Sequence, residues 1–138
     1  MNSALRISEA TSLAFHTMAL LSAEPARRHP ARELAETLCV SEAHLAKVLQ
    51  RLARRGFVES ARGPGGGFRL GTDANDVTLL EIYEAIEGPF RPDNCLLGGV
   101  LCGGGRCVFG ELVKTVNEKV RAYLSETRLG QLADVYER

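Results

Sequence analysis

The sequence predicts a mainly α-helical fold with one small β-hairpin, and three features of the chain support this prediction. Apolar residues recur at helical spacing in several segments that are bounded by proline, glycine or a capping residue. The turn at 63–67, of sequence G-P-G-G-G, separates two short segments that favour strands. The length of 138 residues suits one domain with a single core and an appended element.

The first half of the chain is expected to form three helices and then the hairpin. Helices are predicted from Ile7 to Ser22, from about Pro30 to Leu38, and from Ser41, a favourable N-cap residue, to a stop at Gly56. The second and third helices carry apolar residues at spacings of three and four, which places these residues on one buried face. Strands are expected near 57–61 and 68–70.

The second half is expected to hold a fourth helix, a loop and a long final helix. The fourth helix is predicted from 76–78 to Ile86, with Gly88-Pro89 as its end, and a loop should follow up to residue 107. An apolar stripe from Val108 to Leu124 then predicts a long helix, followed by a short one around 129–135. Such a stripe on a helix that leaves a small domain predicts packing against a second copy, and therefore a homodimer.

Helix, helix, turn, helix and a glycine-tipped hairpin is the order of a winged helix-turn-helix, which binds double-stranded DNA. The start of the third helix should enter the major groove, and the hairpin, or wing, should approach the backbone or the minor groove. The alternatives are a solvated helix with ordinary surface charges, or a winged-helix module that binds protein. The predicted DNA-binding residues are Ser41, Glu42, Ala43, His44, Lys47, Arg51, Arg62, Gly63, Pro64, Gly65 and Arg69.

The distribution of charge agrees with this interpretation. The chain has no net charge, but residues 1–70 hold ten Lys or Arg and six Asp or Glu, a balance of +4. Residues 71–138 hold seven Lys or Arg and eleven Asp or Glu, a balance of −4. A basic half suits a surface that faces phosphates, and an acidic half suits the side that faces away.

Several other classes of protein are disfavoured. No run of eighteen apolar residues predicts a membrane span, and the N-terminus lacks the pattern of a secretion signal, so a cytoplasmic protein is expected. The glycine-rich turn lacks the Lys-Ser/Thr of a phosphate-binding loop, and no catalytic carboxylate pair or nucleophile motif is present. A thiol redox enzyme, the weaker alternative, would normally carry a C-x-x-C pair, which is missing. The sequence therefore predicts a protein that is not an enzyme.

Three cysteines in the predicted loop are candidate metal ligands. Cys95, Cys102 and Cys107 follow the spacing C-x6-C-x4-C among several glycines. Thiolates are soft ligands that suit iron–sulfur clusters, zinc or Cu(I), whereas structural zinc sites normally use paired C-x2-C motifs. The spacing leaves three readings open, which are an iron–sulfur cluster, a zinc site and unligated redox thiols. Cys39, in an apolar turn, is expected to be a small buried hydrophobic residue.

The chain resembles the Rrf2 family of bacterial winged-helix regulators over nearly its whole length. The motifs that carry the resemblance are L-A-E-T-L-C-V-S-E-A-H-L-A-K-V-L-Q-R-L, G-F-V-E-S-A-R-G-P-G-G-G-F-R-L, V-T-L-L-E-I-Y-E-A-I-E-G-P and the three cysteines. The resemblance implies a homodimer that binds partly palindromic operators. It also implies an iron–sulfur cluster on Cys95, Cys102 and Cys107, near the dimer interface, which senses redox state, nitric oxide or iron–sulfur status.

The fourth ligand departs from the family pattern. Members with a [2Fe–2S] cluster place a histidine three residues after the third cysteine, where this chain has Gly110. Nitric-oxide-sensing members use an aspartate from the first helix of the partner subunit, where this chain has Ser12. His16, one turn later, resembles a histidine that some members use and is the tentative fourth ligand. The cluster type, [2Fe–2S] or [4Fe–4S], therefore stays undetermined.

Together these observations predict three parts of the chain. Residues 1–88 should form a winged helix-turn-helix that binds DNA, residues 89–107 a cluster-binding loop, and residues 108–138 a dimerisation helix and tail. The alternative is a winged-helix regulator without a cluster, which responds through its thiols or through zinc.

Overall fold

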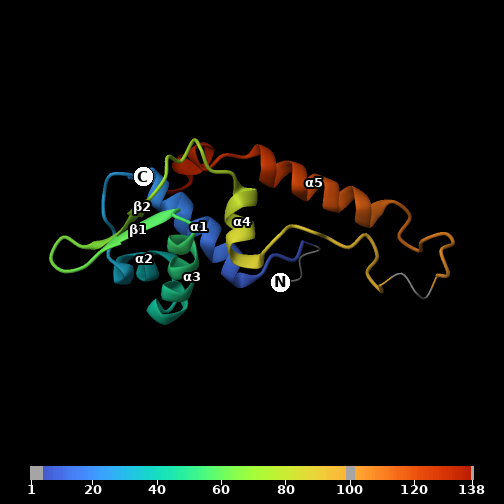
Figure 1. Cartoon of the computed structure of the whole chain (residues 1–138), viewed down its shortest axis with the longest axis horizontal. Helices are drawn as coiled ribbons and strands as arrows, with labels where there is room; N and C mark the ends of the chain where they lie inside the picture. The colour runs from blue at the N-terminus through green and yellow to red at the C-terminus, as the bar shows by residue number, and fades with distance from the viewer. Residues whose placement is uncertain (1–4, 99–101, 138) are drawn as a thin grey trace.

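The computed structural model describes residues 5–98 and 102–137 and confirms a mainly helical chain with one two-stranded antiparallel hairpin (Figure 1). Three helices come before the hairpin and two helices and a 3-10 segment come after it. The elements are α1 (Glu9–Ala23), α2 (Ala31–Leu38), α3 (Glu42–Arg54), β1 (Val58–Ala61), β2 (Gly67–Leu70), α4 (Leu79–Glu87), α5 (Leu112–Glu126) and η1 (Leu129–Tyr136). Residues 99–101 of the predicted loop lie outside the described residues.

Capping side chains set where the helices begin. The Ser8 hydroxyl accepts the Thr11 N–H at the start of α1, so this helix begins two residues later than predicted. Ser41 caps α3 as expected, by accepting the His44 N–H at 3.1 Å. Thr78 opens α4 with a complete capping box, in which its backbone N–H donates to a carboxylate one turn ahead.

The long final helix is shorter than its apolar stripe. The stripe starts at Val108, but α5 begins at Leu112 because residues 107–111 form turns. Gly110 has a φ of +57°, a left-handed conformation that interrupts a helix. The predicted start of the helix is therefore wrong by about one turn. Val108 and Phe109 belong to the end of the cysteine loop instead.

The core lies around α1, which packs against α3, α4 and η1. Its fully buried side chains come from every helix of the body, and each buried Leu or Met contributes about 1.5–3 kcal/mol of stabilisation relative to an exposed position. The largest of them are Met18, Leu21, Leu34, Leu45, Leu49, Leu52, Ile82 and Leu129. The C-terminal segment closes this core, since the Leu129 N–H donates to the Val77 carbonyl at 2.9 Å.

The wing is anchored to the body by His29. Its backbone N–H donates to the Phe68 carbonyl at 2.7 Å, and the Phe68 N–H donates back to the His29 carbonyl at 2.8 Å. Gly67 fits beside this bridge because a Cβ atom there would lie 2.5 Å from the His29 carbonyl oxygen. His29 therefore forms an isolated antiparallel bridge beside β2, and the sheet itself keeps two strands.

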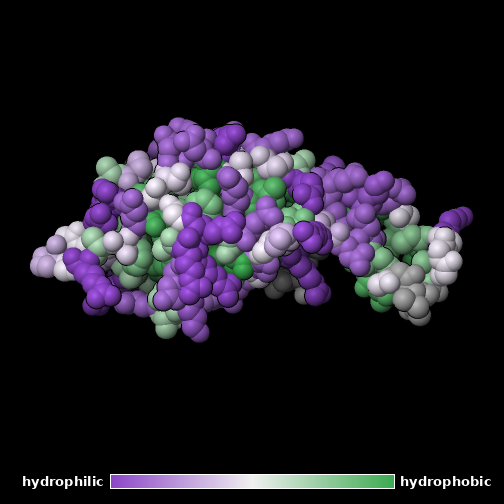
Figure 2. Space-filling view, in the orientation of Figure 1, coloured by the Kyte–Doolittle hydropathy of each residue, from purple (hydrophilic) through white to green (hydrophobic). Residues whose placement is uncertain are grey.

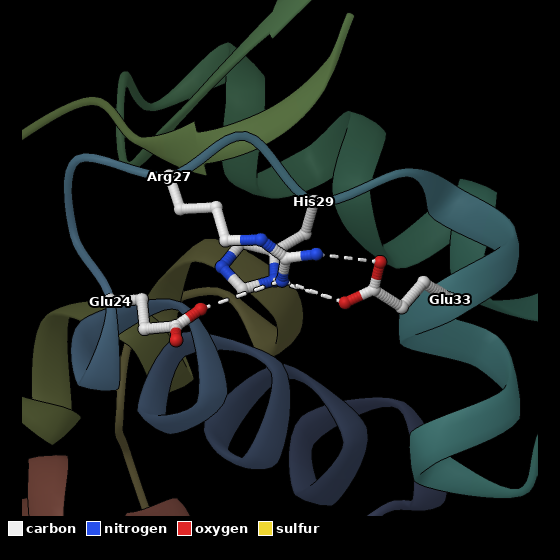
Figure 3. A network of polar contacts seen from close by, with 4 residues as sticks. All are labelled: Glu24, Arg27, His29 and Glu33. Carbon is white, nitrogen blue, oxygen red and sulfur yellow. Dashed lines mark hydrogen bonds and ion pairs between the residues drawn. The ribbon is translucent and has the colours of Figure 1, made fainter. Parts of the chain in front are cut away.

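A polar network holds the bridge segment in place (Figure 3). Arg27 forms two hydrogen bonds with the Glu33 carboxylate, at 2.7 and 2.9 Å, and contacts Glu24 at 3.4 Å and the His29 ring at 2.9 Å. The bonds from Arg27 lower the pKa of Glu33 and raise that of Arg27. Arg27 and Glu33 are largely exposed, so this network orients the segment and adds little stability.

The molecule has a body and an arm. The body holds α1 to α4, the hairpin and η1, while α5 leaves it and carries the cysteine loop at its far end (Figure 1). The wing and the cysteine loop lie at opposite ends of the long axis. Hydrophobic atoms are visible at the loop end of the arm, whereas the visible side of α5 is mainly hydrophilic (Figure 2). No described helix is both long and apolar enough to cross a lipid bilayer.

Candidate nucleic-acid interface and cysteine loop

Helix α3, the predicted recognition helix, has one buried face and one exposed face. Leu45, Val48, Leu49 and Leu52 are buried in the core. Among the predicted DNA-binding residues of this helix, Ser41, Glu42, Ala43 and Lys47 are exposed and His44 is half-buried. The His44 ring lies 4.0 Å from the exposed carboxylate of Glu9 at the start of α1. The N-terminal turn of α3 is thus presented outward on a rigid support.

Arg51 differs from the other predicted residues of α3. Its guanidinium Nη1 donates to the Ile86 carbonyl at 3.1 Å, at the C-terminal end of α4. The main-chain carbonyls at a helix C-terminus carry partial negative charge, so a guanidinium is favoured there. Arg51 therefore joins α3 to the C-terminal end of α4.

The wing presents its basic residues in two ways. Arg62, Gly63, Pro64 and Gly65 at the tip are exposed, and Arg62 forms no ion pair within residues 5–98 and 102–137. Arg69 is half-buried, and its Nε lies 3.2 Å from the carboxylate of Glu59 on the neighbouring strand. Arg62 is therefore the cation of the wing that is available to a phosphate, whereas Arg69 is already partly neutralised.

The three loop cysteines line one cavity. Cys95, Cys102 and Cys107 line a cavity of ≈ 220 Å³, which is otherwise walled by Leu96, Leu97, Val108 and Phe109. The Phe109 N–H donates to the Cys107 sulfur at 3.4 Å. Within the described residues no three potential ligands are close enough to hold one metal ion. The donor set, soft thiolates with an amide donor to sulfur, is chemically of the kind that holds an iron–sulfur cluster. Among the described residues that line this cavity, the cysteines are the only potential metal ligands.

His16, the candidate fourth ligand, lines a different cavity from the cysteines of the same chain. Its ring is exposed on α1, and Nδ1 lies 2.6 Å from the Ser12 carbonyl. It faces a different cavity of ≈ 480 Å³, which is lined mainly by apolar residues of α1, α5 and η1, among them Phe15, Val120 and Tyr123. His16 is therefore a surface residue and not part of the core.

The prediction that Cys39 is a buried thiol is wrong. Cys39 is exposed and ends α2 in a left-handed conformation, with a φ of 55°. Its thiol points toward the Glu36 carbonyl at 3.8 Å. The turn that links the two helices therefore rotates this residue outward, although its neighbours in the sequence are apolar.

Sequence reasoning also missed the residues at the stem of the cysteine loop. Phe90 is buried and stacks edge-to-face on Tyr83, with ring centroids 5.2 Å apart. The guanidinium of Arg121, on α5, lies over the Phe90 ring. It also donates a hydrogen bond to the backbone carbonyl of Phe90 at 2.7 Å. The available signal is the aromatic residue Phe90 directly after Gly88-Pro89, a pair that by itself predicts only the end of a helix.

Comparison with known proteins identifies the family. Residues 7–135 match the family model Rrf2, described as an iron-dependent transcriptional regulator. The HTH-type transcriptional regulator IscR of Klebsiella pneumoniae (strain 342) is 31% identical over 105 residues, which are 76% of this chain and 64% of that relative. The match thus spans less than two thirds of the relative's length.

Solved structures share the fold. CymR of B. subtilis, the global cysteine regulator, is 25% identical with a TM-score of 0.78, over 96% of this chain and 99% of that chain. IscR of T. potens is 22% identical with a TM-score of 0.73, over 96% of this chain and 89% of that chain. The arrangement of α1 to η1 is therefore that of known winged-helix regulators, and the relatives are regulators and not enzymes. This chain belongs to the Rrf2 family of transcriptional regulators.

Proposed function

We propose that this protein is a homodimeric DNA-binding regulator that senses a signal through its cysteine loop. The observation that carries the DNA-binding part is the exposed N-terminal turn of α3 together with the exposed wing tip. In this reading Ser41, Glu42, Ala43, His44 and Lys47 approach base edges and nearby phosphates. Arg62 and the glycine tip approach the backbone or the minor groove.

The proposed dimer uses α5 and its surroundings. Leu112, Val116 and Tyr123 of α5 are exposed large hydrophobic side chains, which a second copy would cover. The apolar cavity between α1, α5 and η1 continues this surface. Under this proposal residues 1–88 contact DNA, residues 89–107 sense the signal and residues 108–138 hold the dimer together. The two recognition helices would then lie about one DNA turn apart, on the order of 34 Å.

The proposed sensor is an iron–sulfur cluster on Cys95, Cys102 and Cys107. Support comes from the shared cavity of the three thiols and from the match to a family described as iron-dependent. A bound cluster supplies a redox-active, oxidant-sensitive centre whose charge depends on its state. We propose His16 from a second copy as its fourth ligand, since His16 is exposed and stands apart from the cysteines of its own protomer.

A thiol switch without a cluster is the second candidate. Cys102 and Cys107 are exposed, so oxidants and electrophiles reach them directly.

Anaerobic purification separates the two candidates. The cluster proposal expects a coloured wild-type protein with iron and sulfide, and loss of both in Cys102→Ala. His16→Ala should keep iron but change the absorption spectrum, and an unchanged spectrum would remove His16 from the ligand set. A colourless, iron-free wild type that still binds DNA would leave the thiol switch. Sedimentation that shows only monomer, with no DNA binding at low salt, would refute the regulator itself.

A further inference from the structure

Phe90 is the point at which the cysteine loop leaves the body. Its side chain is 8% exposed, so displacement of the ring would open the core. Both of its backbone polar groups are engaged: the N–H donates to Glu84 Oε2 at 3.0 Å and the carbonyl accepts from Arg121 Nη2 at 2.7 Å. The Arg121 guanidinium also lies over the Phe90 ring, 4.7 Å from its centroid. Phe90 is therefore held by both α4 and α5.

The stem beyond Phe90 is fixed to the same face of α5. Asn117, one turn before Arg121, donates through Nδ2 to the Asp93 carbonyl at 3.1 Å and to Asn94 Oδ1 at 3.0 Å. Cys95 follows immediately in the sequence. Two side chains of α5, Asn117 and Arg121, thus hold the segment that leads into Cys95. Asn117 bonds to residues 93 and 94, whereas Arg121 bonds to Phe90, which is buried in the body.

The other side of Phe90 leads to the recognition helix. Ile86, four residues earlier in the chain, accepts the hydrogen bond from Arg51 of α3. The neighbouring Glu87 carboxylate accepts hydrogen bonds from Ser8 and Thr11 at the start of α1. The end of α4 is therefore joined directly to α3 and to α1. A shift of Phe90 that moves the end of α4 would change the hydrogen bonds to both helices.

We propose that Arg121 is a positioning residue, which fixes Phe90 so that the state of the cysteine loop reaches the recognition helix through the end of α4 and Arg51. The inference rests on the proposed function, because it assumes that the loop senses and that α3 binds DNA. Its physical basis is that Arg121 makes a charge-assisted hydrogen bond and a ring contact to one buried residue. Without this contact, Phe90 would keep its hydrogen bond to Glu84 and its ring contact to Tyr83 on α4, but it would lose its hydrogen bond and ring contact to α5.

The test compares DNA affinity before and after modification of the loop. All proteins carry Cys39→Ser, since Cys39 is exposed beside the start of α3. The probe is iodoacetamide, and the DNA is a duplex of about 30 base pairs selected from a random library by the unmodified protein, enough for two half-sites. The quantity measured is the ratio of the Kd values of alkylated and reduced protein. In the Cys39→Ser parent we expect alkylation to change the Kd for DNA by at least about fivefold in either direction, which is a typical coupling between two sites.

Arg121→Met keeps the aliphatic stem of the side chain but removes its charge and donors. We expect this variant to bind DNA in the reduced form and to bring the ratio within about twofold of 1. Lys114→Met is the matched control, because it removes the same charge from α5 two turns earlier and should keep the parent ratio. Arg121→Lys, which retains the charge, should give an intermediate ratio and tests the contact where the Met variant fails to fold.

A measurement without DNA keeps the inference separate from the proposed function. Amide exchange over residues 89–94 should become faster in Arg121→Met than in Lys114→Met, because the stem loses its attachment. Unchanged exchange, or a ratio that stays at the parent value in Arg121→Met, would overturn the positioning role while leaving the regulator intact. A parent ratio of 1 in a protein that binds DNA would also overturn it. Failure of the reduced parent to bind any DNA would refute the proposed function instead.

Discussion

The body and the arm of this protein are stabilised in different ways. In the body, α3 buries four large side chains and α1 buries eight residues. In the arm, α5 has the same length as α1 but buries only Leu124, near its C-terminal end, where it rejoins the body. A helix of this length is marginal in water without packing on an apolar face. The comparison shows that the body buries its apolar faces within one chain, whereas α5 leaves Leu112, Val116 and Tyr123 exposed, as a surface that the proposed dimer would cover.

The largest effect should come from truncation in the body. Leu49→Ala removes a fully buried side chain of the recognition helix, and we expect the free energy of unfolding to fall by about 2–5 kcal/mol. Val116→Ala in the arm should change the stability of the monomer by less than about 0.5 kcal/mol. Urea denaturation below the dimer dissociation constant measures both. Equal losses would contradict the division into a self-sufficient body and a dependent arm.

A charge placed on α5 tests whether the exposed apolar face of the arm is covered by a second copy. Val116→Asp places a carboxylate within the exposed apolar face of α5, and burial of that charge against a second copy should weaken the dimer by at least about 2 kcal/mol, or about thirtyfold. Sedimentation equilibrium measures the dissociation constant. Glu118→Asp, which keeps the charge of an exposed position on the same helix, serves as the control. An unchanged dissociation constant would exclude this face of α5 from the interface.

Two arginines at the DNA side should behave differently. Arg62 is exposed at the wing tip, so Arg62→Ala should reduce the slope of log K against log salt by about 1, as expected for one lost phosphate contact. Arg51 is already bonded to the Ile86 carbonyl, so Arg51→Met should lower affinity with little change in slope. Titration of labelled duplex at several salt concentrations checks both. A reduced slope for Arg51→Met would restore Arg51 to the DNA surface as the sequence predicts.

The smallest effect concerns pH at the junction of α1 and α4. Hydrogen bonds from Ser8 and Thr11 lower the pKa of Glu87 below its usual value of about 4.5. A depressed carboxyl pKa stabilises the fold at pH values above the unfolded pKa, and this contribution disappears as the pH falls through the folded pKa. Because Glu87 is largely exposed, the loss should stay below about 1 kcal/mol. Thermal unfolding of Glu87→Gln should show a weaker dependence on pH between about 3 and 5 than wild type.

The sequence predicted the local features of the body well. Capping residues such as Ser41, glycines with positive φ in the wing and apolar residues at helical spacing act over a few residues, so they can be recognised without knowledge of the fold. The order of helices and hairpin then predicted the winged helix. The predicted start of the final helix is wrong because the apolar stripe continues past Gly110, where the backbone is left-handed. The predicted burial of Cys39 is wrong because the left-handed turn at this residue exposes it.

By itself the sequence determined the helices, the wing, the candidate DNA-binding residues and the three cysteines as a set. The tertiary structure decided which of these residues are engaged elsewhere, since Arg51 meets α4 and Arg69 meets Glu59. It also decided the contact between Phe90 and Arg121, which are 31 residues apart in the chain. The physical reason is range: caps and turns are set by neighbouring residues, whereas the partner of a long side chain depends on which helices the core brings together.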